Sequence, residues 1–142
     1  MDNQKVINEL NAYLKGGEYM GIHSYEQYIH HVTDPQIKAE LQRIQQEHKE
    51  HAAKIAERIQ DLGGKAVDDT GAMLSLKEGM MKLKGIPNTI EEILESAIKG
   101  QEMGMKMTEE IVRGDLDTDS RDLVEENLNE DREQIDRLNR LV

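Results

Sequence analysis

The sequence predicts an all-α domain, a four-helix bundle of two antiparallel hairpins joined by a long crossover that contains a short helix. Three observations favour this fold class. The chain has 142 residues with only two prolines, and Glu, Leu, Ile and Lys, which are good helix formers, are abundant. Apolar residues recur at steps of three and four in four long segments. A long connection separates the second segment from the third, as parallel consecutive bundle helices require.

The first two predicted helices form one hairpin. The first spans residues 3–32, and the second starts at Asp34 and Pro35, a good N-cap followed by a residue suited to the first helical position. Because the turn between them is tight, the two helices are expected to run antiparallel. Gly63-Gly64 ends the second helix.

The last two predicted helices form the second hairpin. The third begins with a Thr-x-x-Glu capping box at Thr89 and runs to Arg113, where Gly114 stops it. The fourth is capped by residues 117–119 and continues to the C-terminus. The connection before them carries Leu76, Met80 and Leu83 at the spacing of a short amphipathic helix. We therefore expect one domain over 1–142, divided into a first hairpin at 1–62, a crossover at 63–88 and a second hairpin at 89–142.

The two hairpins resemble each other in sequence at a constant offset of 83 positions. Glu18 aligns with Gln101 and Asp34 with Asp117, and the stretch EHKEH at 47–51 aligns with EDREQ at 130–134. Matches in all four helices at one offset, without a gap, indicate an internal two-fold repeat.

A polar layer is predicted in the middle of this bundle. The apolar pattern of the second helix continues through His48 and His51, so both histidines should face the core. The other three helices are interrupted by polar residues at the same level. The predicted layer consists of Glu18, His48, His51, Gln101, Asp131 and Gln134.

Two interpretations of the layer stay open, because an unpaired buried carboxylate would cost several kcal/mol or more. Either the carboxylates pair with the histidines, or a cation lies among them. Glu18, His48, His51 and Asp131 are a suitable ligand set for Fe, Zn or Mn. Three further residues, Glu47, Gln101 and Gln134, are candidate ligands of second rank.

Composition excludes several function classes. With no cysteine, the chain forms neither disulfides nor thiolate metal sites. A net charge of −11 disfavours nucleic-acid binding, because no basic patch neutralises phosphates. The sequence has no signal-peptide pattern and no apolar stretch long enough for a membrane span, so we expect a soluble cytoplasmic protein.

The hairpins, the crossover, the repeat and the mid-helix polar layer together resemble the ferritin-like superfamily. The chain is most similar to small bacterial ferritin-like proteins of unknown function whose second helix ends in Leu-Gly-Gly, here residues 62–64. Some of those proteins are encoded beside general-stress genes. The resemblance implies a homo-oligomer, such as a dimer, and a role in stress physiology.

The superfamily's di-iron pattern has a Glu on the first and third helices and Glu-x-x-His on the second and fourth. Glu18 and His51 match this pattern, whereas His48, Gln101 and Gln134 replace a Glu, a Glu and a His. Asp131 shortens the remaining Glu. The resemblance therefore implies one transition-metal ion rather than a full di-iron centre.

Three functions follow, in decreasing order of support. The first is a metal-binding protein, either a stress-related oxidoreductase or a metal-holding protein. The second is a non-catalytic structural or adaptor bundle with a vestigial site, acting in stress or sporulation physiology. A cation-storage cage ranks last, because the layer lacks a ferroxidase ligand set.

Overall fold

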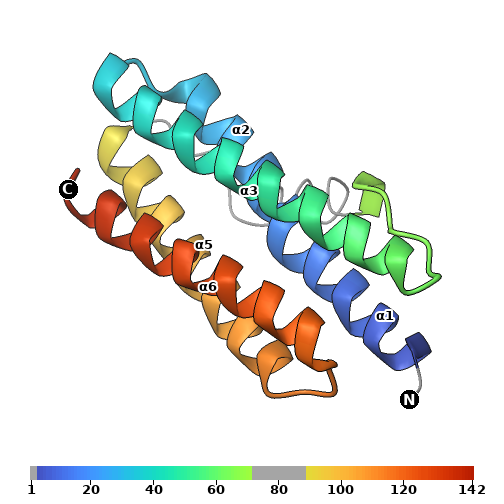
Figure 1. The fold of residues 1–142 in the computed structure, drawn as a ribbon. Helices are drawn as coiled ribbons and strands as arrows, with labels where there is room; N and C mark the ends of the chain where they lie inside the picture. Colours follow the sequence, from blue (N-terminus) through green and yellow to red (C-terminus); the bar gives the residue numbers. More distant parts are fainter. Residues whose placement is uncertain (1–2, 72–88) are drawn as a thin grey trace.

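The computed structural model describes residues 3–71 and 89–142, and these residues form a bundle of antiparallel hairpins (Figure 1). Within those ranges the chain is helical and contains no strand, which confirms the predicted all-α class. The elements are α1 (Asn3–Tyr13), η1 (Leu14–Tyr19), α2 (Met20–His31), α3 (Pro35–Asp61), α5 (Ile90–Val112) and α6 (Thr118–Asn139).

The first helix differs from its prediction. It is not a continuous α-helix over residues 3–32, because residues Leu14–Tyr19 form the π-helix η1 between α1 and α2. A π-helical turn accommodates more residues than an α-helical one and therefore rotates the segment before it relative to the segment after it. A pattern at three- and four-residue steps carries no signal for such a turn.

The predicted helix starts are confirmed by their caps. The Asp34 carboxylate accepts hydrogen bonds from the backbone N–H groups of Gln36 and Ile37 at 2.9 and 3.0 Å. The Thr89 hydroxyl oxygen caps α5, and Asp117 caps α6, each accepting from a backbone N–H three residues on. These bonds satisfy donors that the first helical turn leaves free. They fix where each hairpin turns.

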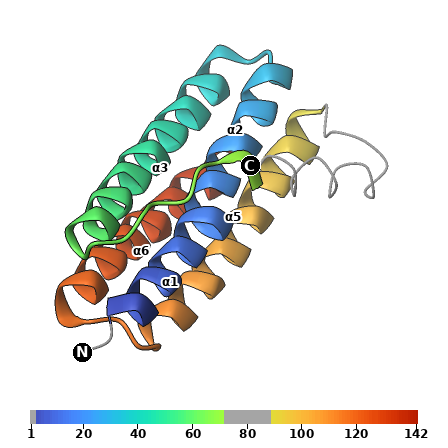
Figure 2. The same cartoon turned by 90° about the vertical axis from the view of Figure 1, so that its right-hand side faces the viewer.

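The chain leaves α3 through a glycine turn and runs back along the first hairpin. Gly63 adopts a φ of +89°, in the left-handed region that glycine tolerates best, and Gly64 N–H donates to the Ile59 carbonyl at 2.9 Å. Beyond it the Asn11 amide donates to the Lys65 carbonyl. Figure 2 shows this green segment passing across α1 toward α2. The predicted short helix with Leu76, Met80 and Leu83 lies outside the described residues.

The hydrophobic core is divided into two clusters by the polar layer. One cluster joins α1 to the C-terminal part of α3 and the N-terminal part of α6, and the other joins α2 to the opposite ends of α3, α5 and α6. The first cluster includes Leu10, Leu14, Ile55, Ile59 and Val124, and the second includes Tyr25, Leu41, Ile44, Ile93 and Leu138. Buried polar groups between them are Glu18, His48, His51, Gln101, Asn127, Asp131 and Gln134. The apolar clusters therefore hold both ends of the layer in place.

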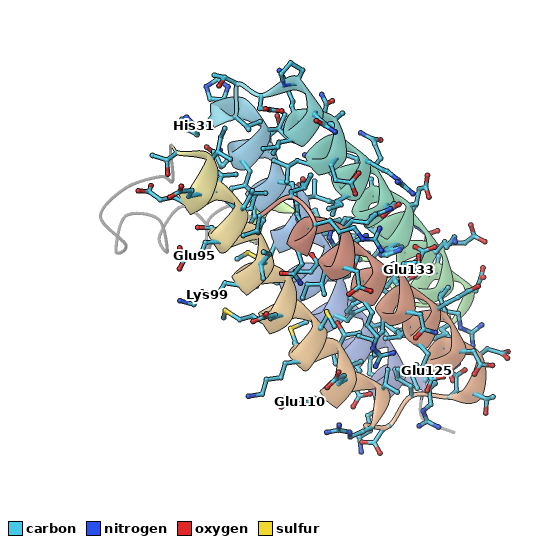
Figure 3. The ribbon with its side chains drawn as sticks, turned by 90° about the vertical axis from the view of Figure 1, so that its left-hand side faces the viewer. His31, Glu95, Lys99, Glu110, Glu125 and Glu133 are labelled. Atoms are coloured by element: carbon cyan, nitrogen blue, oxygen red, sulfur yellow. The ribbon has the colours of Figure 1, made fainter. Side chains whose placement is uncertain are left out.

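The outer faces of the helices carry the excess negative charge. Figure 3 shows Glu95 and Glu110 projecting outward from α5, and Glu125 and Glu133 from α6. None of the helices in the described ranges is long and apolar enough to cross a membrane.

Candidate metal centre

Three segments from both hairpins bring the candidate ligands together. Glu18 comes from η1, His48 and His51 from α3, and Asp131 from α6. His48 and His51 are three residues apart, so they lie on one face of α3. One ligand atom from each of the four residues lies within 4.8 Å of the others, and all four side chains are buried. These residues therefore form a group that could hold a metal ion.

Glu18 lies at the centre of this group. Its Oε2 atom is 3.3 Å from His48 Nδ1 and 3.2 Å from His51 Nδ1. Its other oxygen, Oε1, accepts a hydrogen bond from the Tyr13 hydroxyl at 2.9 Å, and that hydroxyl accepts one from the Asn127 amide at 3.2 Å. The two carboxylate oxygens thus have separate roles, one held by Tyr13 and one directed at the histidines.

The π-helix brings Tyr13 and Glu18 together. In an α-helix, residues five apart face different directions, because each residue turns the chain by about 100°. The wider turn of η1 allows both side chains to face the core, where Tyr13 is 0% and Glu18 is 1% exposed. Sequence reasoning missed Tyr13, since no periodic signal marks a π-helical turn. Asn127 was also missed, although it continues the buried stripe of α6 between Val124 and Asp131.

Two buried atoms in the group have no hydrogen-bond partner among the described residues. These are His51 Nδ1 and Asp131 Oδ1, which lie 3.9 Å apart, and His51 Nδ1 has only its ionic contact with Glu18 Oε2 at 3.2 Å. Buried polar atoms are hydrogen-bonded in the great majority of cases, so two unpartnered atoms facing each other need an explanation. A nitrogen and an oxygen donor at this spacing suit a cation bound between them.

Charges within the group shift the pKa values of its members. Burial alone would raise the pKa of Glu18, but His48 and His51 outweigh burial and lower that pKa to about 2. Burial would lower the pKa of His51, but the Glu18 carboxylate and Glu130 raise it to about 9. Burial and the negative charge of Glu18 raise the pKa of Asp131 to about 7. In the metal-free protein, His51 and Asp131 therefore hold their protons more strongly than usual, and a bound cation would displace these protons.

Glu130 is a further acidic residue at the group that the sequence analysis did not select as a ligand. Its carboxylate contacts His51 Nε2, on the ring edge opposite the Nδ1 atom that faces Glu18. The Glu130 side chain is 47% exposed, so it connects the buried imidazole to the surface. A carboxylate on the far nitrogen of a ligating histidine fixes the ring orientation and the tautomer. The sequence signal for Glu130 was the internal repeat, in which it aligns with the second-rank candidate Glu47.

The second-rank candidates lie on the other side of the layer and bind one another. The Gln101 amide donates to Gln134 Oε1 at 2.5 Å, and the Gln134 amide donates to Glu47 Oε1 at 3.0 Å. Glu47 also forms an ion pair with Arg137. Tyr25 donates to Gln101 Oε1 at 3.2 Å. Gln101 and Gln134 are both buried, which settles the inward direction that the sequence left open, and their amides bind other residues of the layer.

A cavity of about 390 Å³ opens between the first helix and α5 beside this group. Glu18, His48 and Asp131 line one part of it, and glycine and methionine residues of η1, α2 and α5 line the rest. His51 is not part of its lining. Three of the four candidate ligands are therefore accessible from the cavity.

Solved structures with the same fold come from three bacteria. A two-domain protein of Anabaena variabilis, with DJ-1/ThiJ/PfpI-like and ferritin-like domains, is 18% identical with a TM-score of 0.79, and the match covers 99% of this chain. This chain spans only 36% of that protein. A bacterioferritin-related, dodecameric thioferritin of Bacteroides fragilis is 21% identical with a TM-score of 0.74 and coverages of 98% and 84%.

A ferritin-like, diiron-carboxylate protein of Bacillus anthracis is 20% identical, with a TM-score of 0.73 and coverages of 99% of this chain and 97% of that one. These similarities confirm the ferritin-like fold. No curated protein matches the chain. One family model matches residues 5–114, which include Glu18, both core histidines and Gln101. The chain therefore belongs to the family described as a domain of unknown function, DUF2383.

Proposed function

We propose that this protein binds a single transition-metal ion, Fe, Mn or Zn, through Glu18, His48, His51 and Asp131. The observation that carries the proposal is the convergence of four buried ligand atoms, two of which, His51 Nδ1 and Asp131 Oδ1, form no hydrogen bond with a described residue. Two imidazole nitrogens and two carboxylate oxygens suit all three metals. Such an ion supplies Lewis-acid or redox chemistry, depending on its identity.

The second half of the layer supports one ion rather than two. Gln101 and Gln134 are amides that hydrogen-bond to each other, and Glu47 is paired with Arg137. A second cation would have to break these contacts and would gain no anionic ligand from either glutamine. The full di-iron chemistry of the superfamily therefore does not fit this chain, and a metal-holding protein or one-metal oxidoreductase fits it better.

The proposal treats residues 1–142 as one functional domain, because Asp131 of α6 completes a group built by the first hairpin. The homodimeric state, the cytoplasmic location and the role in stress physiology, which the sequence resemblance implies, stay predictions.

The test is the metal content of untagged protein, measured by elemental analysis after loading with Fe(II), Mn(II) or Zn(II). We expect one ion per chain, lost in His51→Ala and retained in Lys49→Ala, an exposed control on the same helix. Metal-free protein after all three loadings, or unchanged metal in His51→Ala, would overturn the proposal.

A metal-free adaptor is the second candidate, and the contacts of His48 and His51 with Glu18 and Glu130 favour it. In that case the layer is a polar core in which carboxylates compensate the histidines. The same experiment separates the two functions, because an adaptor retains its fold and secondary structure without binding any of the three metals.

A further inference from the structure

The cavity beside the metal-binding group has the size of a small-molecule site. Its volume of about 390 Å³ falls within the range of roughly 300–1,000 Å³ that is typical of ligand pockets. It lies between η1 and α2 on one side and α5 on the other. Its polar residues at one end include Glu18, His48 and Asp131, the same groups proposed to hold the metal.

Glycines on both sides keep the cavity open. A Cβ atom added at Gly100 or Gly104 of α5 would meet no described atom within 4 Å, so these two positions face open space. On the opposite side, a Cβ atom at Gly17 would lie 3.1 Å from the Tyr13 ring, and one at Gly21 would lie 3.5 Å from the His48 ring.

The glycines of α5 are costly for the helix. Each glycine inside a helix destabilises it by about 0.5–1 kcal/mol relative to alanine. Among the described residues, no atom within 4 Å of either position requires glycine there. Glycine at both positions leaves this part of the cavity wall without side chains.

Asp131 connects the cavity to the proposed metal site. Asp131 lines the cavity, is 4% exposed, and its Oδ1 atom has no hydrogen-bond partner among the described residues. Glu18 and His48 line the same end, whereas His51 does not. Coordination positions that the protein leaves unfilled on a bound ion would therefore face the cavity.

The remaining wall is apolar and deformable. Met20, Met103, Met105 and Met107 line it together with Ala97 and Tyr28. Methionine side chains are flexible and polarizable, so they adapt to apolar ligands of different shapes. The cavity thus combines a metal-facing polar end with an apolar body.

We infer that this cavity binds a small amphiphilic molecule whose oxygen-donor head group coordinates the metal and whose apolar tail lies against Gly100, Gly104 and the methionines. The inference rests on the proposed metal site and adds the chemical class of its ligand. A carboxylate head group is an oxygen donor of the kind that these metal ions accept as a ligand. Straight-chain monocarboxylates are therefore the matched probes.

The experiment titrates Co(II)-loaded protein with acetate, butyrate, hexanoate and octanoate, and follows the visible Co(II) spectrum. Head-group coordination changes the spectrum at saturation in the same way for every acid. The affinity should rise roughly fourfold for each added methylene until the cavity is full, because each buried CH₂ contributes a similar increment. Primary alcohols of equal length show whether the carboxylate is needed or any oxygen donor suffices.

Gly104→Leu is the decisive variant, since the new side chain would occupy the open space. It should bind Co(II) normally and lose the dependence of affinity on chain length. Gly100→Leu, from the same wall, is a second variant should the first not fold. Glu102→Leu places the same side chain on the exposed face of α5 and should behave as the unmodified protein.

The outcomes separate this inference from the proposed function. Failure to bind Co(II), Fe(II), Mn(II) and Zn(II) alike removes both. Normal Co(II) binding with a spectrum insensitive to every probe, or with affinity independent of tail length, overturns only the ligand. Chain-length dependence that persists in both Gly104→Leu and Gly100→Leu overturns the assignment to this cavity.

Discussion

The two halves of the polar layer occupy equivalent positions of a repeated sequence, yet they differ in chemistry. In the half built by the first hairpin, Glu18 and two histidines converge and leave a buried imidazole nitrogen without a hydrogen-bond partner. In the half built by the second hairpin, the Gln101 amide donates to Gln134 Oε1, while Gln101 Oε1 accepts from Tyr25 and the Gln134 amide donates to Glu47. The two halves thus differ in their available ligand atoms, because neutral amides that hydrogen-bond to each other close one half and leave the other unaffected.

Asp131 belongs by sequence to the closed half but lies with the open one. It aligns with His48 in the repeat, and its Oδ1 atom lies 3.9 Å from His51 Nδ1. A single residue of the second hairpin therefore completes the group, and the two-fold symmetry of the layer is broken at that point.

The largest expected effect comes from reopening the closed half. The double substitution Gln101→Glu with Gln134→His removes the amide pair and restores an anionic and an imidazole ligand. We expect the metal content to rise from one ion to two per chain, measured by elemental analysis. Gln45→Glu, which changes another buried amide outside the group, should leave one ion. A content of one ion in the double variant would show that other residues close this half.

A second test uses the opposite pH dependence of the free and the occupied group. The pKa of His51 is raised to about 9 in the folded metal-free protein, against about 6.5 in the unfolded chain. Its stabilising contribution is therefore complete below pH 6.5 and is lost as the pH rises to 9, a loss on the order of 2 kcal/mol in the free energy of unfolding. Urea denaturation with a chelator at both pH values measures it.

Bound metal should reverse this pH dependence of the free energy of unfolding. A ligating histidine must be neutral, so the stabilisation by Zn(II) should increase over the same pH interval. Equal metal-free stability at pH 6.5 and 9 would contradict the assigned pairing of His51 with Glu18.

The next effect concerns the hydrogen bond that holds Glu18. Tyr13→Phe removes the donor to Oε1 and should lower the free energy of unfolding by about 2 kcal/mol, as expected for a buried bond to a charged acceptor. Tyr19→Phe removes a half-exposed hydroxyl that donates to the Val67 carbonyl and should cost less than about 1 kcal/mol. Equal losses in the two variants would show that Glu18 does not depend on Tyr13.

The smallest effect should come from an ion pair outside the layer. His23 and Asp69 are 3.2 Å apart, and the aspartate is 53% exposed. His23→Gln should change the free energy of unfolding by less than about 0.5 kcal/mol and leave the metal content unchanged. Thermal denaturation and elemental analysis measure both quantities. A large loss of metal in this variant would mean that the group extends beyond the four residues.

Much of the fold was predictable because its signals are local. Asp34, Thr89 and Asp117 mark helix starts by side chains that accept backbone hydrogen bonds, and such caps are visible in sequence. The spacing of apolar residues placed Gln101 and Gln134 in the polar layer but left open whether their side chains turn inward, and in the structure both are buried.

Other features of the candidate site depend on geometry that the spacing of apolar residues does not encode. The contact of Glu130 with His51 is set by the relative rotation of α3 and α6, and the alignment of Glu130 with Glu47 in the repeat does not reveal which residue it contacts. The mutual bond between the two glutamines likewise depends on the distance between α5 and α6. The spacing of apolar residues indicates which face of a helix is buried. It does not indicate which side chains on the buried faces contact each other.

The π-helix has a consequence for how the repeat itself is understood. The two hairpins align in sequence without a gap, but η1 adds a wider turn to the first copy, whereas the α5 copy is α-helical from Ile90 to Val112. Residues before η1 are therefore out of rotational phase with their counterparts. Tyr13 is fully buried, while its counterpart Ser96 is only partly buried. The two copies therefore align without a gap although their helices differ in rotation. This rotation directs residue 13 of the first copy fully into the core, but not residue 96 of the second.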